Sequence, residues 1–176
     1  MNSIKQIEVL LADRLVGRLA LTKEGLCAFE YAPDWLGSGF SISPFELPLR
    51  SGVFIAKPRP FEGGFGVFDD CLPDGWGLLI VDRYLQQKGI NPRALTLLDR
   101  LALVGSSGRG ALEFRPDHSV VTRQDYADFE KLALEAERIL GSDEYRGKGI
   151  EEFQDRGGSP GGARPKIFAR YEGKEW

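Results

Sequence analysis

Cysteine, histidine and methionine are scarce in this sequence. Its 176 residues include two cysteines, one histidine and one methionine. Cys27 and Cys71 lie far apart, and neither has another cysteine or a histidine nearby. Because a zinc site needs about four ligands at short paired spacings, the sequence encodes none. Both cysteines lie in apolar surroundings, so we expect two buried free thiols in a reducing compartment rather than a disulfide.

Long apolar runs and an excess of positive charge are also missing. No stretch approaches the ~20 apolar residues of a membrane-spanning helix, and the first residues lack the apolar core of a signal peptide. The formal net charge of -3 argues against a broad electrostatic grip on nucleic acid. Apolar residues nevertheless make up 42% of the chain, which is enough for a hydrophobic core. We expect a cytoplasmic protein with no membrane partner.

The first half of the chain is predicted to be rich in β-structure. Three apolar runs separated by short polar turns predict an antiparallel meander, with strands at residues 7–11, 15–21 and 26–31. The following stretch, 32–60, is rich in proline, glycine and serine, and we expect ordered loop or short edge strands there. Its apolar islands lie at residues 40–42, 47–49 and 53–55.

Three helices are predicted after residue 70. The first spans about 75–88, with Asp74 as its N-cap and Gly89 as its left-handed stop. The second spans about 93–103 and is followed by a short strand at 111–114. The third begins after Thr122 and ends at Gly141, with apolar residues recurring at intervals of three and four. A further strand is expected at 167–171.

The segment with the clearest chemical potential is Gly157–Lys166. It combines four glycines and a serine with Arg164 and Lys166, directly before an apolar run. Glycines allow successive backbone N–H groups to converge on an anion, and the two cations can neutralise its charge. The spacing does not fit a Walker loop, because three residues separate Gly162 from Lys166. The composition alone is equally compatible with a flexible surface loop.

The sequence also resembles the HipA family of toxin kinases, in several blocks that follow the order of that family. The last block, Ser159–Lys166, resembles the SxxGAxxK loop of those kinases. The earlier blocks are Val16–Leu19, Ser43–Pro44, Leu47–Leu49, Phe68–Gly77, Leu97–Leu98, Leu103–Gly105 and Gly108–Leu112. One block would be weak support, but the ordered set covers nearly the whole chain.

The resemblance implies an α+β fold. A small antiparallel β-rich subdomain with helices would occupy residues 1–121, and the beginning of a kinase-like N-lobe would occupy 122–176. The glycine-rich loop would lie near the phosphates of ATP, through Ser159, Gly161, Gly162, Ala163 and Lys166. Ser159 would be autophosphorylated, which would displace the loop. From the residues alone, a turn residue is the simpler interpretation of Ser159, and a solvated lysine that of Lys166.

The resemblance further implies that the parent protein phosphorylates protein serine or threonine with ATP and Mg²⁺. In such kinases the catalytic aspartate, the Mg²⁺ ligands and the lysine that pairs with the phosphates lie downstream of the loop. This chain ends ten residues after Lys166. We therefore assign no catalytic residue and expect the chain alone to be inactive and to bind ATP weakly. It would be a truncated chain, a proteolytic product or the product of a split gene.

The partners implied by the family are proteins. They are a helix-turn-helix antitoxin, through which the toxin contacts DNA indirectly, and a protein substrate of the aminoacyl-tRNA synthetase class; the biological outcome would be persistence. The alternative is a separately encoded, non-catalytic subdomain that binds and regulates a partner kinase. The retained glycine loop argues against that alternative.

Overall fold

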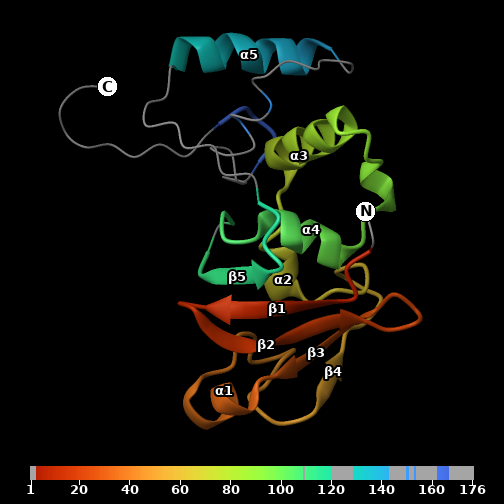
Figure 1. Cartoon of the computed structure of the whole chain (residues 1–176), viewed down its shortest axis with the longest axis vertical. Helices are drawn as coiled ribbons and strands as arrows, with labels where there is room; N and C mark the ends of the chain where they lie inside the picture. The colour runs from red at the N-terminus through yellow and green to blue at the C-terminus, as the bar shows by residue number, and fades with distance from the viewer. Residues whose placement is uncertain are drawn as a thin grey trace, which may run out of the picture. The chain divides into compact units, whose positions relative to one another are not determined.

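An antiparallel sheet forms the centre of the first part of the chain (Figure 1). The computed structural model describes residues 3–108, 110–119, 129–142, 150, 153 and 162–166. Its strands are β1 (Gln6–Leu11), β2 (Arg14–Leu21), β3 (Cys27–Tyr31), β4 (Val53–Ile55) and β5 (Leu112–Arg115). They lie in the order β4-β3-β2-β1-β5, and every neighbouring pair is antiparallel. The predicted meander and the α+β class are confirmed.

The strand sequences explain how the sheet builds its core. In β3, Cys27, Phe29 and Tyr31 are buried while the residues between them are less so, which is the period of two expected of a strand with one covered face. Gly17 in β2 permits a close approach, since a Cβ there would lie 2.6 Å from the Phe29 ring and 2.3 Å from the Glu30 carbonyl oxygen. The Phe29 ring of β3 therefore lies directly over Gly17 of β2.

Helices from distant parts of the sequence complete this core. Helix α2 (Gly66–Asp69) contributes Phe68, whose ring centroid lies 5.5 Å from that of Phe29 and 6.4 Å from that of Phe114. Helix α4 (Leu97–Val104) packs against β1, β2 and β5 (Figure 1). The apolar face of α4 is fully buried, so this helix is the main cover of the sheet.

The helix predicted at 93–103 begins later than expected. Residues Pro92–Ala94 form a short 3-10 helix, η1, and α4 starts after Thr96. Thr96 Oγ1 accepts a hydrogen bond from the Asp99 N–H at 3.2 Å, and Asp99 Oδ2 accepts one from the Thr96 N–H at 3.0 Å. This reciprocal capping box sets the start of the helix.

The stretch 32–60 differs most from the prediction. It contains helix α1 (Pro33–Ser38), which begins with a proline at a position that needs no N–H donor and buries Trp35. Of the three apolar islands only 53–55 forms a strand. Residues 40–42 do not, and in 47–49 Leu47 makes only an isolated bridge with Ser43.

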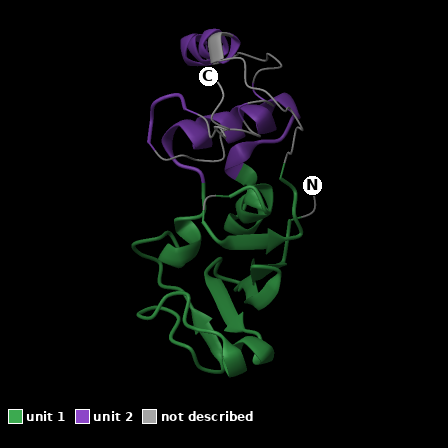
Figure 2. Ribbon diagram, turned by 90° about the vertical axis from the view of Figure 1, so that its left-hand side faces the viewer, with its two compact units in different colours: residues 1–72, 94–119 green, residues 73–93, 120–176 purple. Residues whose placement is uncertain are grey.

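The chain divides into two units, coloured separately in Figure 2. The first comprises residues 1–72 and 94–119, and the second comprises 73–93 and 120–176. The segment 73–93 thus belongs with the later part of the sequence. The division into compact units does not test the domain boundary predicted after residue 121, which stays a prediction.

The second unit contains α3 (Gly75–Gln87) and α5 (Phe129–Gly141). The prediction of α3 is confirmed to within one residue, and Gly89 has the expected left-handed φ of 74°. The cap predicted at Thr122 and the strand predicted at 167–171 lie outside the described residues. Buried side chains form a core of their own: Trp76, Ile80, Leu132, Ala136, Ile139, Ile150 and Phe153.

Candidate functional site

The described end of the glycine-rich segment is an exposed stretch of backbone. Gly162 and Ala163 are exposed and Lys166 is half-buried, while Ser159 and Gly161 lie outside the described residues. Gly162 has a φ of 88°, which favours glycine. A Cβ at Gly162 would lie 3.1 Å from Lys166 Nζ. The structure therefore brings the lysine ammonium group back over the backbone of the loop.

The loop contacts the first turn of α3 within the second unit. The Gly162 N–H donates to Asp74 Oδ1 at 3.2 Å, and the Trp76 N–H donates to the Gly162 carbonyl oxygen at 2.9 Å. We call this pair of hydrogen bonds the α3–loop contact. Gly75 has a φ of 43°, and a Cβ there would lie 2.5 Å from the Gly162 carbonyl oxygen. Glycine at position 75 is therefore required twice, by its conformation and by the approach of the loop.

Asp74 does not play the part that the sequence predicted for it. It stands at the N-cap position, but its side chain makes no capping hydrogen bond to α3. One carboxylate oxygen instead accepts from Gly162, which lies 88 residues further along the chain. No local signal could have revealed this contact, because capping patterns read only the next three or four residues.

Trp76 anchors the start of α3 in the core of the second unit. Its side chain is 1% exposed, and its ring meets that of Phe153 edge-on, with centroids 5.3 Å apart. The buried indole N–H has no acceptor among the described residues. The interpretation of Trp76 as a core residue is confirmed. Its anchoring gives the loop a rigid support.

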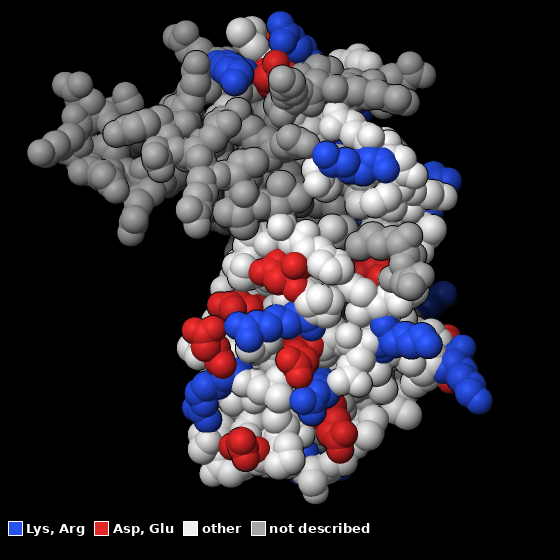
Figure 3. Space-filling model, viewed as in Figure 1, with Lys and Arg blue, Asp and Glu red and all other residues white. Residues whose placement is uncertain are grey.

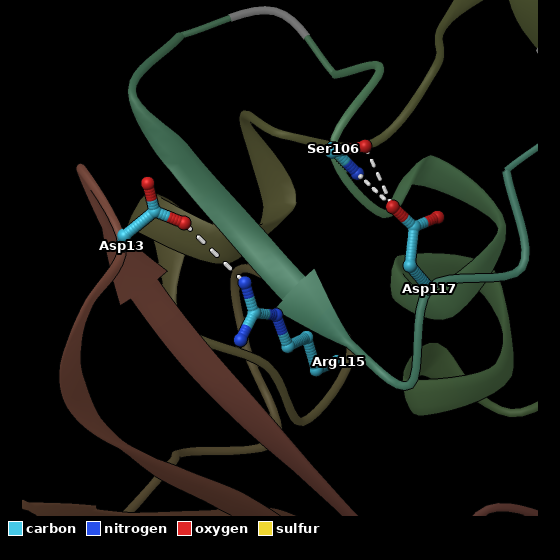
Figure 4. Close-up of polar contacts among 4 residues, drawn as sticks. All are labelled: Asp13, Ser106, Arg115 and Asp117. Atoms are coloured by element: carbon cyan, nitrogen blue, oxygen red, sulfur yellow. Dashed lines mark hydrogen bonds and ion pairs between the residues drawn. The ribbon is translucent and has the colours of Figure 1, made fainter.

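A second polar cluster links the residues directly after α4 to those directly after β5 (Figure 4). Asp117 Oδ2 accepts from the Ser106 N–H at 3.0 Å and from its hydroxyl at 2.6 Å, while Oδ1 accepts from the Ser119 N–H at 2.8 Å. Partial desolvation of this largely exposed residue would raise the pKa of Asp117, but these hydrogen bonds outweigh it and lower the pKa below its usual value. Arg115 Nη2 also donates to Asp13 Oδ1 at 3.4 Å, and this contact is drawn in Figure 4. The cluster fixes loop geometry.

Asp99 joins the start of the chain to α4. Its carboxylate is buried and accepts hydrogen bonds from the Ile4 N–H at 3.0 Å and the Thr96 hydroxyl at 2.7 Å, besides the capping bond from the Thr96 N–H. Burial would raise the pKa of Asp99, yet these hydrogen bonds and the nearby His118 lower it. The carboxylate is thus held ionised as a structural anchor.

The remaining reactive side chains do not form a catalytic centre in the described part of the chain. Cys27 and Cys71 are free and buried, as predicted, and burial raises the pKa of each thiol to about 11. They are therefore protonated, weak nucleophiles at neutral pH. The described residues contain no group of His, Cys, Asp and Glu arranged to hold a metal ion.

Charges of both signs are mixed on the described part of one face of the molecule. On the face drawn in Figure 3, the described lysines, arginines, aspartates and glutamates are interspersed rather than gathered by sign. None of the described helices is long and apolar enough to cross a membrane.

The comparison with known families concerns the first unit and α3. A family model described as HipA N-terminal domain matches residues 7–115. This chain belongs to the HipA N-terminal domain family. The match includes the start of α3 with Asp74, Gly75 and Trp76, and ends before the glycine-rich loop.

A solved structure shares the fold of this HipA N-terminal domain protein. It is described as the Shewanella oneidensis MR-1 toxin antitoxin system HipA, HipB and its operator DNA complex. The sequences are 21% identical and the TM-score is 0.50. The similarity covers 81% of this chain and 32% of that chain, so the present chain spans about a third of its length.

Proposed function

We propose that this chain is the amino-terminal part of a HipA-like toxin kinase, which transfers phosphate from ATP to serine or threonine of a protein. The observation that carries the proposal is the family match over residues 7–115. The similar solved structure belongs to a toxin antitoxin system, which is consistent with such a role. Since the chain spans only a third of that structure, the catalytic groups would come from outside it.

In this proposal the glycine-rich segment covers the phosphates of ATP–Mg²⁺. Ser159, Gly161, Gly162, Ala163 and Lys166 would line that site, with backbone N–H groups as donors and the lysine as a counter-charge. Phosphorylation of Ser159 would add close to two negative charges there and repel the nucleotide. The support from the fold is that Lys166 Nζ lies close to the Gly162 backbone, as a shared anion site requires.

The proposed partners follow from the family. A helix-turn-helix antitoxin would bind the kinase and connect it to DNA, and an aminoacyl-tRNA synthetase would be the protein substrate, in the cytoplasm. The antitoxin is supported by the similar solved structure, in which HipA is in a complex with HipB and its operator DNA.

The proposal is tested by comparing this chain with the longer protein that the proposal predicts. After incubation with ATP and Mg²⁺, the purified longer protein is expected to carry phosphate on its own residues. The 176-residue chain is expected to turn over no ATP. Robust ATP turnover by the short chain alone would refute the assignment. In the longer protein, Ser159→Ala should abolish phosphate on the loop, and mass spectrometry that finds the phosphate elsewhere would contradict the role of Ser159.

A second candidate is a non-catalytic subdomain that binds and regulates a separate kinase. The family match favours it in one respect, because it ends at residue 115, before the loop. Under this alternative, the chain added in trans would lower the activity of a HipA-like kinase encoded beside it. Under the first proposal, the reading frame continues into the kinase itself.

A further inference from the structure

We infer that the Asp74 carboxylate occupies an anion position of the glycine-rich loop, so that a nucleotide phosphate must displace it. The inference rests on the proposed function for the identity of the phosphate. It makes Asp74 a competitor of the phosphate for the Gly162 N–H. The contact itself, between Asp74 Oδ1 and the Gly162 N–H, is a feature of the chain in hand.

The hydrogen-bonding capacity of Gly162 is what makes the two anions exclusive. A backbone amide has one N–H, and it is aimed at one strong acceptor at a time. In this structure the acceptor is a carboxylate oxygen, 3.2 Å away. A carboxylate and a phosphate are alike in charge and in acceptor geometry, so Asp74 imitates the ligand of the cradle.

The other side of the same residue is also engaged. The Gly162 carbonyl oxygen accepts from the Trp76 N–H at 2.9 Å, and the Trp76 side chain is buried. The α3–loop contact therefore holds both the N–H and the carbonyl group of Gly162 against the start of one helix. Gly162 is exposed, however, so water and solutes reach the contact and release is possible. The loop is held, but reversibly.

The electrostatic consequence acts in the same direction. With its carboxylate at the Gly162 N–H, Asp74 brings a negative charge to the place where a phosphate would arrive. The carboxylate and an incoming phosphate are both negative and repel each other. At a solvent-exposed site, water and salt screen this repulsion but do not abolish it. Removal of the Asp74 charge should therefore strengthen nucleotide binding even where the loop keeps its conformation.

The contact is tested first on the 176-residue chain, without any nucleotide. We measure hydrogen exchange of the Gly162 amide by ¹⁵N NMR in the natural chain, in Asp74→Ala and in Gln86→Ala, a control at an exposed position on α3. Loss of a hydrogen bond to a charged group should speed exchange about tenfold or more in Asp74→Ala and leave it unchanged in the control. Unchanged exchange in Asp74→Ala overturns the inference.

The competition is tested on the longer kinase that the proposed function predicts for this chain. Affinity for a non-hydrolysable ATP analogue with Mg²⁺ should rise several-fold in Asp74→Ala and also in Asp74→Asn, which keeps the shape but removes the charge. Equal or weaker binding by both variants overturns the inference, even where the exchange experiment reveals the contact. Absence of nucleotide binding by every protein, the natural one included, defeats the proposed function and the competition with it, while Gly162 exchange still reports on the contact.

A steric variant supplies an independent measurement. In Gly75→Ala the new Cβ would meet the Gly162 carbonyl oxygen at 2.5 Å and push the loop off α3. Gly89→Ala is the matched control, because Gly89 also has a positive φ but nothing lies within 4 Å of its Cβ position. Gly75→Ala should accelerate Gly162 exchange and tighten analogue binding relative to Gly89→Ala. Equal behaviour of the two variants contradicts the α3–loop contact.

Discussion

Replacement of Asp99 by asparagine should destabilise the first unit through a defined set of lost hydrogen bonds. The two oxygens of this buried carboxylate accept from different donors: Oδ1 accepts from the Ile4 N–H, and Oδ2 accepts from the N–H and hydroxyl of Thr96. An asparagine amide offers only one oxygen. If that oxygen serves Ile4, the amide NH₂ faces the Thr96 N–H, donor against donor.

The size of the effect follows from these contacts. Loss of the charge-assisted hydrogen bond from the Thr96 N–H, which is also half of the capping box, leaves that donor unsatisfied and costs about 2–3 kcal/mol. We therefore expect the free energy of unfolding to fall by about 2–3 kcal/mol. For a chain of this length that is a decrease in Tm of roughly 4–12 °C.

The effect should also depend on pH. The pKa of Asp99 is lowered in the folded protein, so its ionised form stabilises the fold at pH values above the unfolded pKa, about 3.9. As the pH falls through that value towards the folded pKa, protonation removes the stabilisation. The difference in stability between the natural chain and Asp99→Asn should accordingly be full at pH 7 and shrink below about pH 4.

The assay is urea unfolding followed by circular dichroism at several pH values. Asp13→Asn is the matched control, because the Asp13 side chain is 87% exposed and its ion pair with Arg115 spans 3.4 Å. Asparagine also tolerates the positive φ of that turn, so the control should have the same free energy of unfolding as the natural chain. The reasoning is refuted if Asp99→Asn loses no more stability than Asp13→Asn, or if its deficit is the same at pH 3 and pH 7.

Three further outcomes are expected. Gly17→Ala should lower the free energy of unfolding by more than about 2 kcal/mol, because its Cβ would lie 2.3 Å from a backbone oxygen of β3. A variant that unfolds at the same denaturant concentration as the natural chain would contradict this packing. Cys27 and Cys71, each with a pKa of about 11, should resist iodoacetamide at pH 8 in the folded chain and react in urea, as mass spectrometry would report; rapid native labelling would exclude burial. Asp117→Ala should reduce thermal stability less than Asp99→Asn does, since Asp117 is exposed to water, and a larger loss in a melting experiment would reverse that ranking.

Sequence-based prediction succeeds best where structure is decided locally. The three runs that form β1, β2 and β3 are short, apolar and joined by short polar turns, which indicates antiparallel pairing without reference to the rest of the chain. Helix α3 is equally clear because Gly89 marks its end. Each of these signals lies within a few residues of the element that it predicts.

Prediction is weakest where distant side chains decide the structure. Helix α1 lies in a stretch whose proline and glycine content indicates loop, yet burial of Trp35 and donation from its indole to the Phe40 carbonyl oxygen at 2.9 Å stabilise a short helix there. Such a helix is too short to be stable alone and depends on packing against β2. The error at the start of α4 has another cause, since the capping pair Thr96 and Asp99 is a local signal that the predicted span 93–103 ignores.

The candidate site combines both situations. The glycine-rich loop is recognisable from its composition, but its support is not, because Asp74 reads locally as a helix cap. In the structure Asp74 holds the cap position and leaves the helix without a side-chain cap, although a capping carboxylate would stabilise it by about 1 kcal/mol. Residues that break a local rule in this way are expected where function constrains them. In α4 the residues with capping side chains, Thr96 and Asp99, do form the cap, whereas the Asp74 side chain stands at the cap position of α3 and bonds to the loop instead. Asp74 Oδ1 accepts from the Gly162 N–H and makes no capping bond to its own helix, and this is the contact on which the proposed competition with a phosphate rests.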